Sequence, residues 1–206
     1  MLDVHPAHQA ASTWRDFFIH IATIVVGLLI AIGLEQTVEY FHRVHQLHVA
    51  REQLGAEQEA NRTLMAENLS DLQRARAELE QDMLLLRAHQ AGSPLTARLD
   101  YSWTFNRPPD GAWQAVRDNG SLSLLPYDEL KLHVHFYEVL ASVVDAASAW
   151  NMQMHVAAEI AARSPDGSLS PHDTDELISA TSDAKGKLDF TIRLLTFENH
   201  ALHALE

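Results

Sequence analysis

Histidine is the residue type in this chain whose number and spacing most suggest chemistry. The 206 residues include 13 histidines and no cysteine, and His42, His45 and His48 follow one another at three-residue spacing. On a helix these side chains spread over about 120° of one side, and neighbouring imidazoles could share a zinc, copper or nickel ion. The alternative is an interfacial polar stretch. Because one ion could not bind all three without straining the helix, we predict no firm metal site and no cofactor.

Signatures of catalysis are missing from the sequence. The chain contains neither a Gly-x-Ser-x-Gly nucleophile motif nor a glycine-rich phosphate loop, and its carboxylates are scattered. The absence of cysteine excludes disulfides, thiolate metal sites and thiolate nucleophiles. A net charge of −13 argues against nucleic-acid binding, because that affinity comes from Lys and Arg side chains that neutralise phosphates. We therefore expect a protein that is not an enzyme and binds no nucleic acid.

The element that would position the three histidines follows an apolar segment. Residues 17–34 read FFIHIATIVVGLLIAIGL and include no Asp, Glu, Lys or Arg. As a helix this segment covers roughly 27 Å, which matches the hydrocarbon core of a bilayer. We predict a transmembrane helix at 17–34 after a short polar head at 1–16. The alternatives are a buried core helix and a cleaved signal peptide, which would use the small-x-small triplet at 31–33.

Small residues recur along one face of this predicted span. Thr23, Gly27 and Ala31 lie at four-residue spacing, the pattern that lets two helices approach closely in lipid. A homodimer through this face is one expectation, and the general frequency of small residues in membrane helices is the other explanation. Arg15 and Arg43 balance the two flanks, so charge does not decide the orientation. A short head before a large C-terminal part favours export of the C-terminal part.

Beyond the span the chain is predicted to continue as one helix to about residue 91, with 35–91 as a stalk, because no proline occurs before Pro94. Its apolar residues follow a seven-residue grid typical of coiled coils: Val44, Leu47, Leu54, Met65, Leu72, Leu79 and Leu86. The polar residues on the grid are Arg51, Gln58, Asn61 and Asn68. Polar residues at such positions weaken packing but can fix the register.

Residues 92–206 are predicted to form the remaining helices of a bundle that packs on this stalk. Aromatic residues alternate at Tyr101, Trp103 and Phe105, and we expect them to pin an irregular loop onto helices. A short helix opens at Trp113, a long one covers 127–162, and a last one begins at Ser170–Pro171. The predicted core stripe of 127–162 is Leu130, Val134, Tyr137, Leu140 or Ala141, Val144, Ser148, Met152, His155 and Ile160. The predicted fold is all-α: an N-terminal transmembrane helix that continues into a long helix, followed by an antiparallel helical bundle.

Two short motifs resemble those of a group of uncharacterised bacterial single-pass inner-membrane proteins. The segment VVGLLIAIGLEQ at 25–36 is similar to their apolar anchor of the VVxGxLIA type, and Trp113, Gly120 and Leu122 match an aromatic-x(6)-Gly-x-Leu element. The resemblance implies a single-pass location in the bacterial inner membrane and carries over no activity. The chain departs from the group in the scarcity of basic residues before the span, which bears on the orientation.

These features predict a membrane-anchored helical interaction or scaffold protein. Its expected partners are the lipid bilayer and either a second copy of the chain or another protein beside the membrane. The alternative is a sensor-like or metal-handling module, in which protons or metal ions bind His42, His45 and His48 and alter helix packing.

Overall fold

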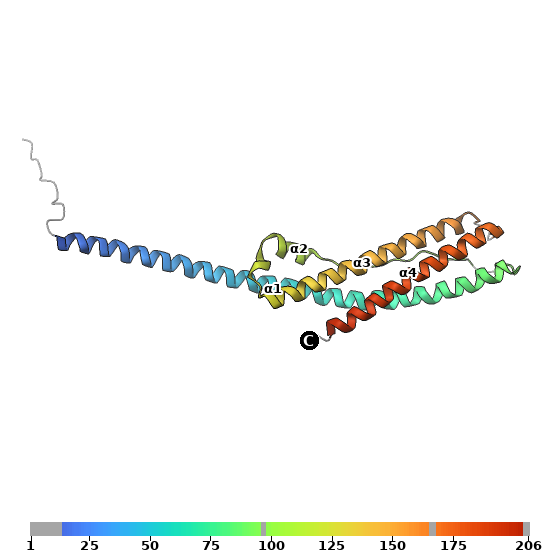
Figure 1. The fold of residues 1–206 in the computed structure, drawn as a ribbon, viewed down its shortest axis with the longest axis horizontal. Coiled ribbons are helices and arrows are strands. Elements are labelled where there is room, and N and C mark those ends of the chain that lie inside the picture. The colour runs from blue at the N-terminus through green and yellow to red at the C-terminus, as the bar shows by residue number, and fades with distance from the viewer. Residues whose placement is uncertain (1–13, 96–97, 165–167, 204–206) are drawn as a thin grey trace, which may run out of the picture. The chain divides into compact units, whose positions relative to one another are not determined.

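The structure is a computed structural model that describes residues 14–95, 98–164 and 168–203, with side chains described up to residue 196. Every regular element in these ranges is helical (Figure 1): α1 (Trp14–Gln90), α2 (Gly111–Asp118), the 3-10 helix η1 (Ser121–Leu124), α3 (Tyr127–Ala162) and α4 (Pro171–His203). The predicted all-α fold is confirmed. The long first helix and the later helices begin and end close to the positions predicted from the sequence, and η1 is an addition to that prediction.

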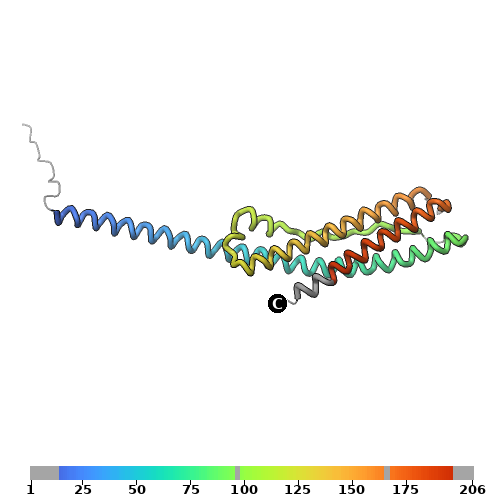
Figure 2. The backbone as a smooth tube through the Cα atoms, viewed as in Figure 1, coloured from blue at the N-terminus to red at the C-terminus, as the bar shows by residue number. Residues whose placement is uncertain are grey.

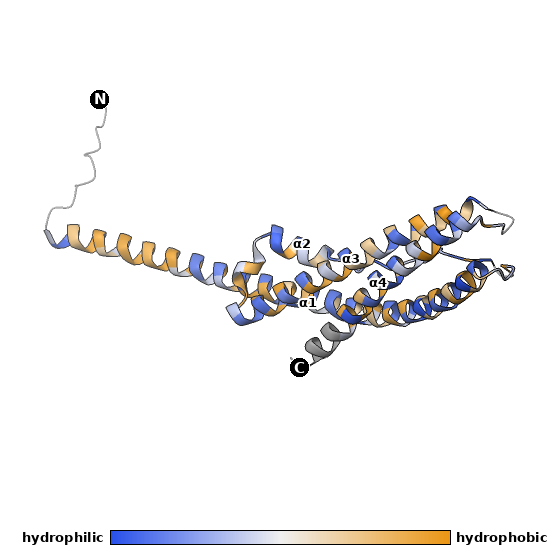
Figure 3. Cartoon of the chain, turned by 45° about the vertical axis from the view of Figure 1, so that its right-hand side comes forward, coloured by the Kyte–Doolittle hydropathy of each residue, from blue (hydrophilic) through white to orange (hydrophobic). Residues whose placement is uncertain are grey.

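The chain divides into two compact units, Met1–Val49 and Ala50–Glu206, and α1 runs through the boundary without a break. In the first unit α1 contains a window with a mean hydropathy of 2.6, none of which is buried within the described chain. Figure 3 shows its turns as a continuous apolar series. The helix is long and apolar enough to cross a membrane, and the described chain does not cover it as it would cover a core helix.

In the second unit three helices and one extended segment share a core. α3 and α4 pack closely against each other and run in opposite directions, whereas α3 runs in the same direction as α1. This direction follows from the chain between α1 and α2, whose described residues form no regular element and return beside α3 to the start of the bundle (Figure 2). Tyr101 in this return segment is buried, and Trp103 and Phe105 are half-buried, so aromatic side chains pin the segment as predicted.

The seven-residue grid of α1 faces this core. The buried residues of α1 all lie in the second unit: Ala50, Leu54, Asn61, Met65, Asn68, Leu72, Ala75, Leu79, Met83 and Leu86. They repeat every three or four positions, which keeps one side of a helix turned towards its neighbours. The grid is therefore covered by the rest of the same chain from Leu54 to Leu86, and these residues are not free to pair with a second stalk.

The predicted core stripe of α3 is correct at Tyr137, Leu140 and Ile160, which are buried, and wrong at Met152 and His155. Met152 is 67% exposed, and His155 is exposed. Beyond Leu140 the buried stripe instead follows Val143, Ala147, Trp150, Met154 and Ala157, and it rejoins the predicted stripe at Ile160. Both stripes have three-four spacing and lie about one residue apart on a helix that is apolar over much of its circumference. The larger side chains, above all Trp150, decide which of the two faces the core.

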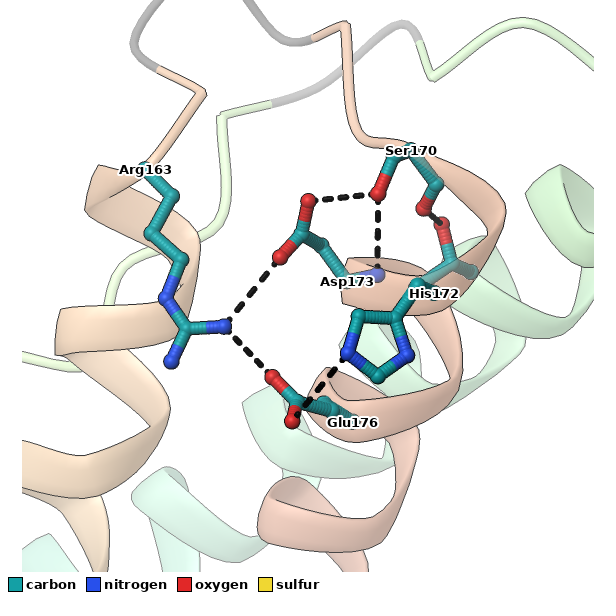
Figure 4. A network of polar contacts seen from close by, with 6 residues as sticks. Arg163, Ser170, His172, Asp173 and Glu176 are labelled. Carbon is teal, nitrogen blue, oxygen red and sulfur yellow. Dashed lines mark hydrogen bonds and ion pairs between the residues drawn. The ribbon is translucent and has the colours of Figure 1, made fainter.

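A polar network joins the end of α3 to the first turn of α4 (Figure 4). The Ser170 hydroxyl accepts a hydrogen bond of 3.1 Å from the backbone N–H of Asp173 and donates one to its carboxylate, which caps the first turn of α4. Arg163, just after α3, donates hydrogen bonds to both Asp173 and Glu176. The pKa of Asp173 lies below its usual value. The hydrogen bond from the Ser170 hydroxyl is the larger cause, and the Arg163 guanidinium is the second. The network fixes where α4 begins.

Candidate functional site

Thr23, Gly27 and Ala31 lie on α1 within the first unit, and all three are exposed in the described chain. The Thr23 hydroxyl donates a hydrogen bond of 2.9 Å to the Ile19 carbonyl, so its polar group is satisfied within its own helix. A Cβ added at Gly27 would meet no atom within 4 Å. The face formed by these residues is uncovered in the described chain, and its pairing with a second helix stays a prediction.

His42, His45 and His48, which follow the apolar window on α1, are exposed as well. One ring nitrogen of His42 lies 3.0 Å from the Gln46 side-chain amide, one helical turn further along. No three His, Asp or Glu side chains within the described ranges are placed so that they could hold a metal ion. A metal site built by a single chain therefore gains no support from the geometry.

The structure brings together a polar site that the sequence did not single out, and Glu57 is its centre. The Glu57 carboxylate accepts hydrogen bonds from the backbone N–H groups of Ala112 (2.7 Å) and Trp113 (3.1 Å) and from the Tyr137 hydroxyl (2.6 Å). The first N–H groups of a helix lack intrahelical partners and carry partial positive charge. Glu57 thus caps α2 from a distant part of the chain and joins α1, α2 and α3.

The aromatic rings beside Glu57 reinforce this junction. Trp113 stacks on Tyr137 with ring centroids 4.7 Å apart and an interplanar angle of 16°. Burial, and secondarily the hydrogen bond to Glu57, raise the pKa of the Tyr137 hydroxyl above its ordinary value. The hydroxyl therefore remains protonated and keeps donating to Glu57. This arrangement makes Glu57 an anchor for α2 rather than a base that is open to a substrate.

Two asparagines on the α1 grid bind the backbone of the return segment. Asn68 donates from its amide to the Asn106 carbonyl (2.8 Å) and accepts from the Asn106 N–H (3.1 Å). Asn61 donates to the Pro109 carbonyl (2.7 Å). Both asparagines are almost fully buried. Since an irregular segment cannot satisfy its own backbone groups, these side chains supply partners that a helix would have found within itself.

The two remaining polar residues on the grid bind α3. Arg51 makes two hydrogen bonds of 2.8 and 2.7 Å to the Glu129 carboxylate, which lowers the pKa of Glu129. The Gln58 amide lies 2.8 Å from Nδ1 of His133. Burial is the main cause of the lowered pKa of His133, so its ring is neutral near pH 7. All four polar grid residues therefore have defined partners in the bundle.

Near the C-terminal end of α1, the carboxylates of Glu78, Asp82 and Asp100 lie close to the buried Tyr101. The Tyr101 hydroxyl and the Thr181 hydroxyl are 2.9 Å apart in the core, and burial raises the pKa of Tyr101 to about 12. Partial burial also raises the pKa of the neighbouring Asp82 to about 6, with smaller contributions from Glu78 and Asp100.

Two hollows lie on the side of α3 that faces the return segment. One of about 360 Å³ lies beside Trp113 and Tyr137, with Arg107 and Arg117 opposite Glu138 and Asp145 in its walls. The other, of about 1160 Å³, runs between the return segment and the C-terminal half of α3. Both walls mix charges of the two signs, and neither contains Glu57 or Asp82. Both hollows have room for a ligand, but the side chains that line them do not form an arrangement that indicates a particular reaction.

The sequence carries no signal for Glu57, because Asp110 before α2 is itself a residue type favoured as a helix N-cap. Asp110 precedes α2 but makes no capping hydrogen bond with its side chain, so the first N–H groups of α2 need an acceptor from elsewhere. Comparison of the chain with protein-family models, with curated proteins and with solved structures finds no match. A functional conclusion therefore depends on the geometry of this chain alone.

Proposed function

We propose that this protein is a single-pass membrane-anchored interaction or scaffold module. One observation carries the proposal: α1 combines a fully exposed apolar window with a continuation into a bundle whose core is closed by its own chain. Such a window is unfavourable in water but favourable in lipid. The hydrogen bonds of Glu57, Asn61 and Asn68 serve packing, which supports a binding role rather than catalysis. The location we propose is the bacterial inner membrane, with the bundle exported.

Insertion of a charge into the window tests the anchor. A charged residue at the centre of a membrane helix costs about 2.5–3.5 kcal/mol, so Leu29→Arg should shift protein from the carbonate-resistant membrane fraction into the soluble or degraded fraction. Leu84→Arg is the matched control, because Leu84 is also on α1 and is exposed to a similar degree, 68% against 63%. Equal fractionation of the two variants would contradict the anchor. The mass of the membrane-bound protein shows whether a leader has been removed.

The orientation and the partner need separate measurements. A C-terminal reporter that is active only after export should be active, and inactivity would reverse the proposed orientation. Association through Thr23, Gly27 and Ala31 predicts that Gly27→Ile lowers crosslinking between copies in membranes, since a bulky side chain keeps two helices apart. A monomer in which Gly27→Ile changes nothing would remove the span as the interface. The bundle could then still bind a partner.

A further inference from the structure

The return segment runs beside α1 as an extended chain. Asn61 and Asn68 lie seven positions apart on α1, which is roughly 10 Å along a helix. They bind Pro109 and Asn106, which are only three positions apart. Each residue of the return segment therefore advances by about 3.5 Å here, the reach of a fully extended chain.

The part of the return segment that leads to Asn106 has the alternation of a β-strand. Tyr101 is buried, Trp103 and Phe105 are half-buried, and the side chains between them are exposed. In a strand the N–H and C=O of one residue point to the same edge, and those of its neighbours point to the opposite edge. Asn106 directs both groups towards Asn68 of α1. The backbone groups of Tyr101, Trp103 and Phe105 therefore point away from α1.

The hollow of about 1160 Å³ borders this second edge of the segment. The return segment from residue 98 to 105 lines one side, and a stripe of α3 lines the other: Asn151, His155, Ala158 and Ala162. No backbone N–H or C=O group of Tyr101, Trp103 or Phe105 has a hydrogen-bond partner within the described residues. Because alanine has a short side chain, α3 leaves room beside these groups. An unpaired strand edge thus faces an open space.

We propose that a partner protein inserts an extended segment into this hollow and pairs with the return segment as an added β-strand. Unpaired groups on one edge of a strand recur every second residue, at about 6.8 Å, and another extended backbone offers both acceptors and donors at that repeat. A small ligand would match one or two of these groups. The pairing rests on the proposed interaction role, whose partner it assigns to the class of extended polypeptides.

The walls of the hollow also indicate the composition of the added segment. Trp103 is half-buried beside the hollow, and Ala158 and Ala162 add apolar surface from α3. Arg98 and Asp100 supply one charge of each sign. The wall is thus nearly neutral, although the whole chain carries a net charge of −13. A segment with alternating apolar side chains and little net charge complements this surface.

Binding of synthetic peptides to the full chain in detergent tests the proposal. The probes are fluorescent peptides of about ten residues in which valine, leucine or phenylalanine alternates with serine or threonine. At least one should bind with a Kd below about 1 mM, measured by fluorescence anisotropy. The tightest binder is then N-methylated on alternate residues in two versions, one for each edge. One version should bind about tenfold more weakly and the other should bind like the parent, because only one edge pairs.

Absence of peptide binding up to about 1 mM, or an equal effect of the two methylated versions, would overturn the proposal. This outcome leaves the anchor untouched, because membrane fractionation of the Leu29→Arg variant tests the anchor without any peptide. The methylated peptides also keep the test decisive where a variant of the chain fails to fold.

Variants of the chain locate the peptide. Ala158→Trp should abolish binding because it fills the hollow, whereas Glu159→Trp, at the next and exposed position outside its wall, should not. Trp103→Pro removes an unpaired N–H and should bind about fivefold more weakly than Trp103→Ala, since both variants lack the indole. Urea unfolding shows which variants keep the bundle. Undiminished binding to a folded Ala158→Trp variant would overturn the site.

Discussion

The side of α1 that faces the bundle changes in character near its middle. From Arg51 to Asn68 the grid carries polar groups that bind α3 and the return segment. From Leu72 to Leu86 its buried side chains are all apolar. We call these parts the polar half and the apolar half. Their difference shows that a seam takes its chemistry from what covers it: irregular backbone requires hydrogen-bonding side chains, and a helix does not.

The largest effect is expected from making the polar half apolar. Asn68→Leu removes both hydrogen-bond partners that the buried Asn68 amide gives the Asn106 backbone, so the free energy of unfolding should fall by about 3 kcal/mol although an ordinary coiled-coil position would gain stability. Urea unfolding of the full chain in detergent measures the change. Gln73→Leu, at an exposed position on α1, is the control. A stabilised Asn68→Leu variant would abolish the distinction between the two halves.

The next effect tests the junction made by Glu57. Glu57→Ala leaves two N–H groups of α2 and the Tyr137 hydroxyl without their acceptor, which should cost about 2 kcal/mol and release α2. Hydrogen exchange at Ala112 and Trp113 should become faster. Glu57→Gln should have an intermediate effect, because an amide keeps one oxygen acceptor. Glu59→Ala, at an exposed position, should leave exchange in α2 unchanged. Protection of α2 without Glu57 would show that other contacts hold it.

Asp82 is the exception within the apolar half and should destabilise the fold. Its folded-state pKa of about 6 lies above its usual value of 3.8, so the folded chain binds this proton more firmly than the unfolded chain. The contribution of Asp82 to stability is therefore greatest below about pH 4 and is lost as the pH rises through about 6. Asp82→Asn should raise the free energy of unfolding at pH 7.5 by about 1 kcal/mol, because solvent screens this half-exposed group. Asp145→Asn is the exposed control.

The smallest effect is expected at the exposed end of the polar half. Arg51 is well placed against Glu129, but both side chains remain in contact with solvent, so the ion pair is screened. Arg51→Met should leave the urea midpoint nearly unchanged at physiological salt. A loss as large as that of Asn68→Leu would show that the ion pair, rather than the buried amides, holds α3 to the polar half.

Much of the fold could be predicted because each helix carries its own signals. The absence of proline between the apolar segment 17–34 and Pro94, the seven-residue grid and Ser170–Pro171 were enough to define α1 and the start of α4. The stripe of α3 was predicted correctly at Tyr137 and Ile160 but wrongly at Met152 and His155, since two apolar stripes overlap there and the burial of Trp150 distinguishes them. A pattern within one element shows that a side is buried without showing what buries it.

The site around Glu57 could not be predicted for a related reason. Its partners lie 55, 56 and 80 positions away, and no local spacing connects them. Asn61 and Asn68 were recognised as polar residues on an apolar grid, yet their role depends on the path of the return segment. That path depends on which side chains satisfy the backbone N–H and C=O groups of the segment, and the spacing of side chains in the sequence does not predict it.

The length of the loops closed by α1 determines when its bundle face is covered. Hydrogen bonds from α1 and the return segment to α3 and α4 join residues that are 75 to 85 positions apart, and the ion pairs of Glu80 and Arg76 with α4 join residues 105 and 113 positions apart. At a synthesis rate of about 5–20 residues per second, the ribosome needs about 4–23 seconds to make these lengths of chain. During this interval the face of α1 from Leu54 to Leu86 has none of its helical partners. The apolar half of α1 stays without its partners longest, because it pairs with α4, the last element to be synthesised.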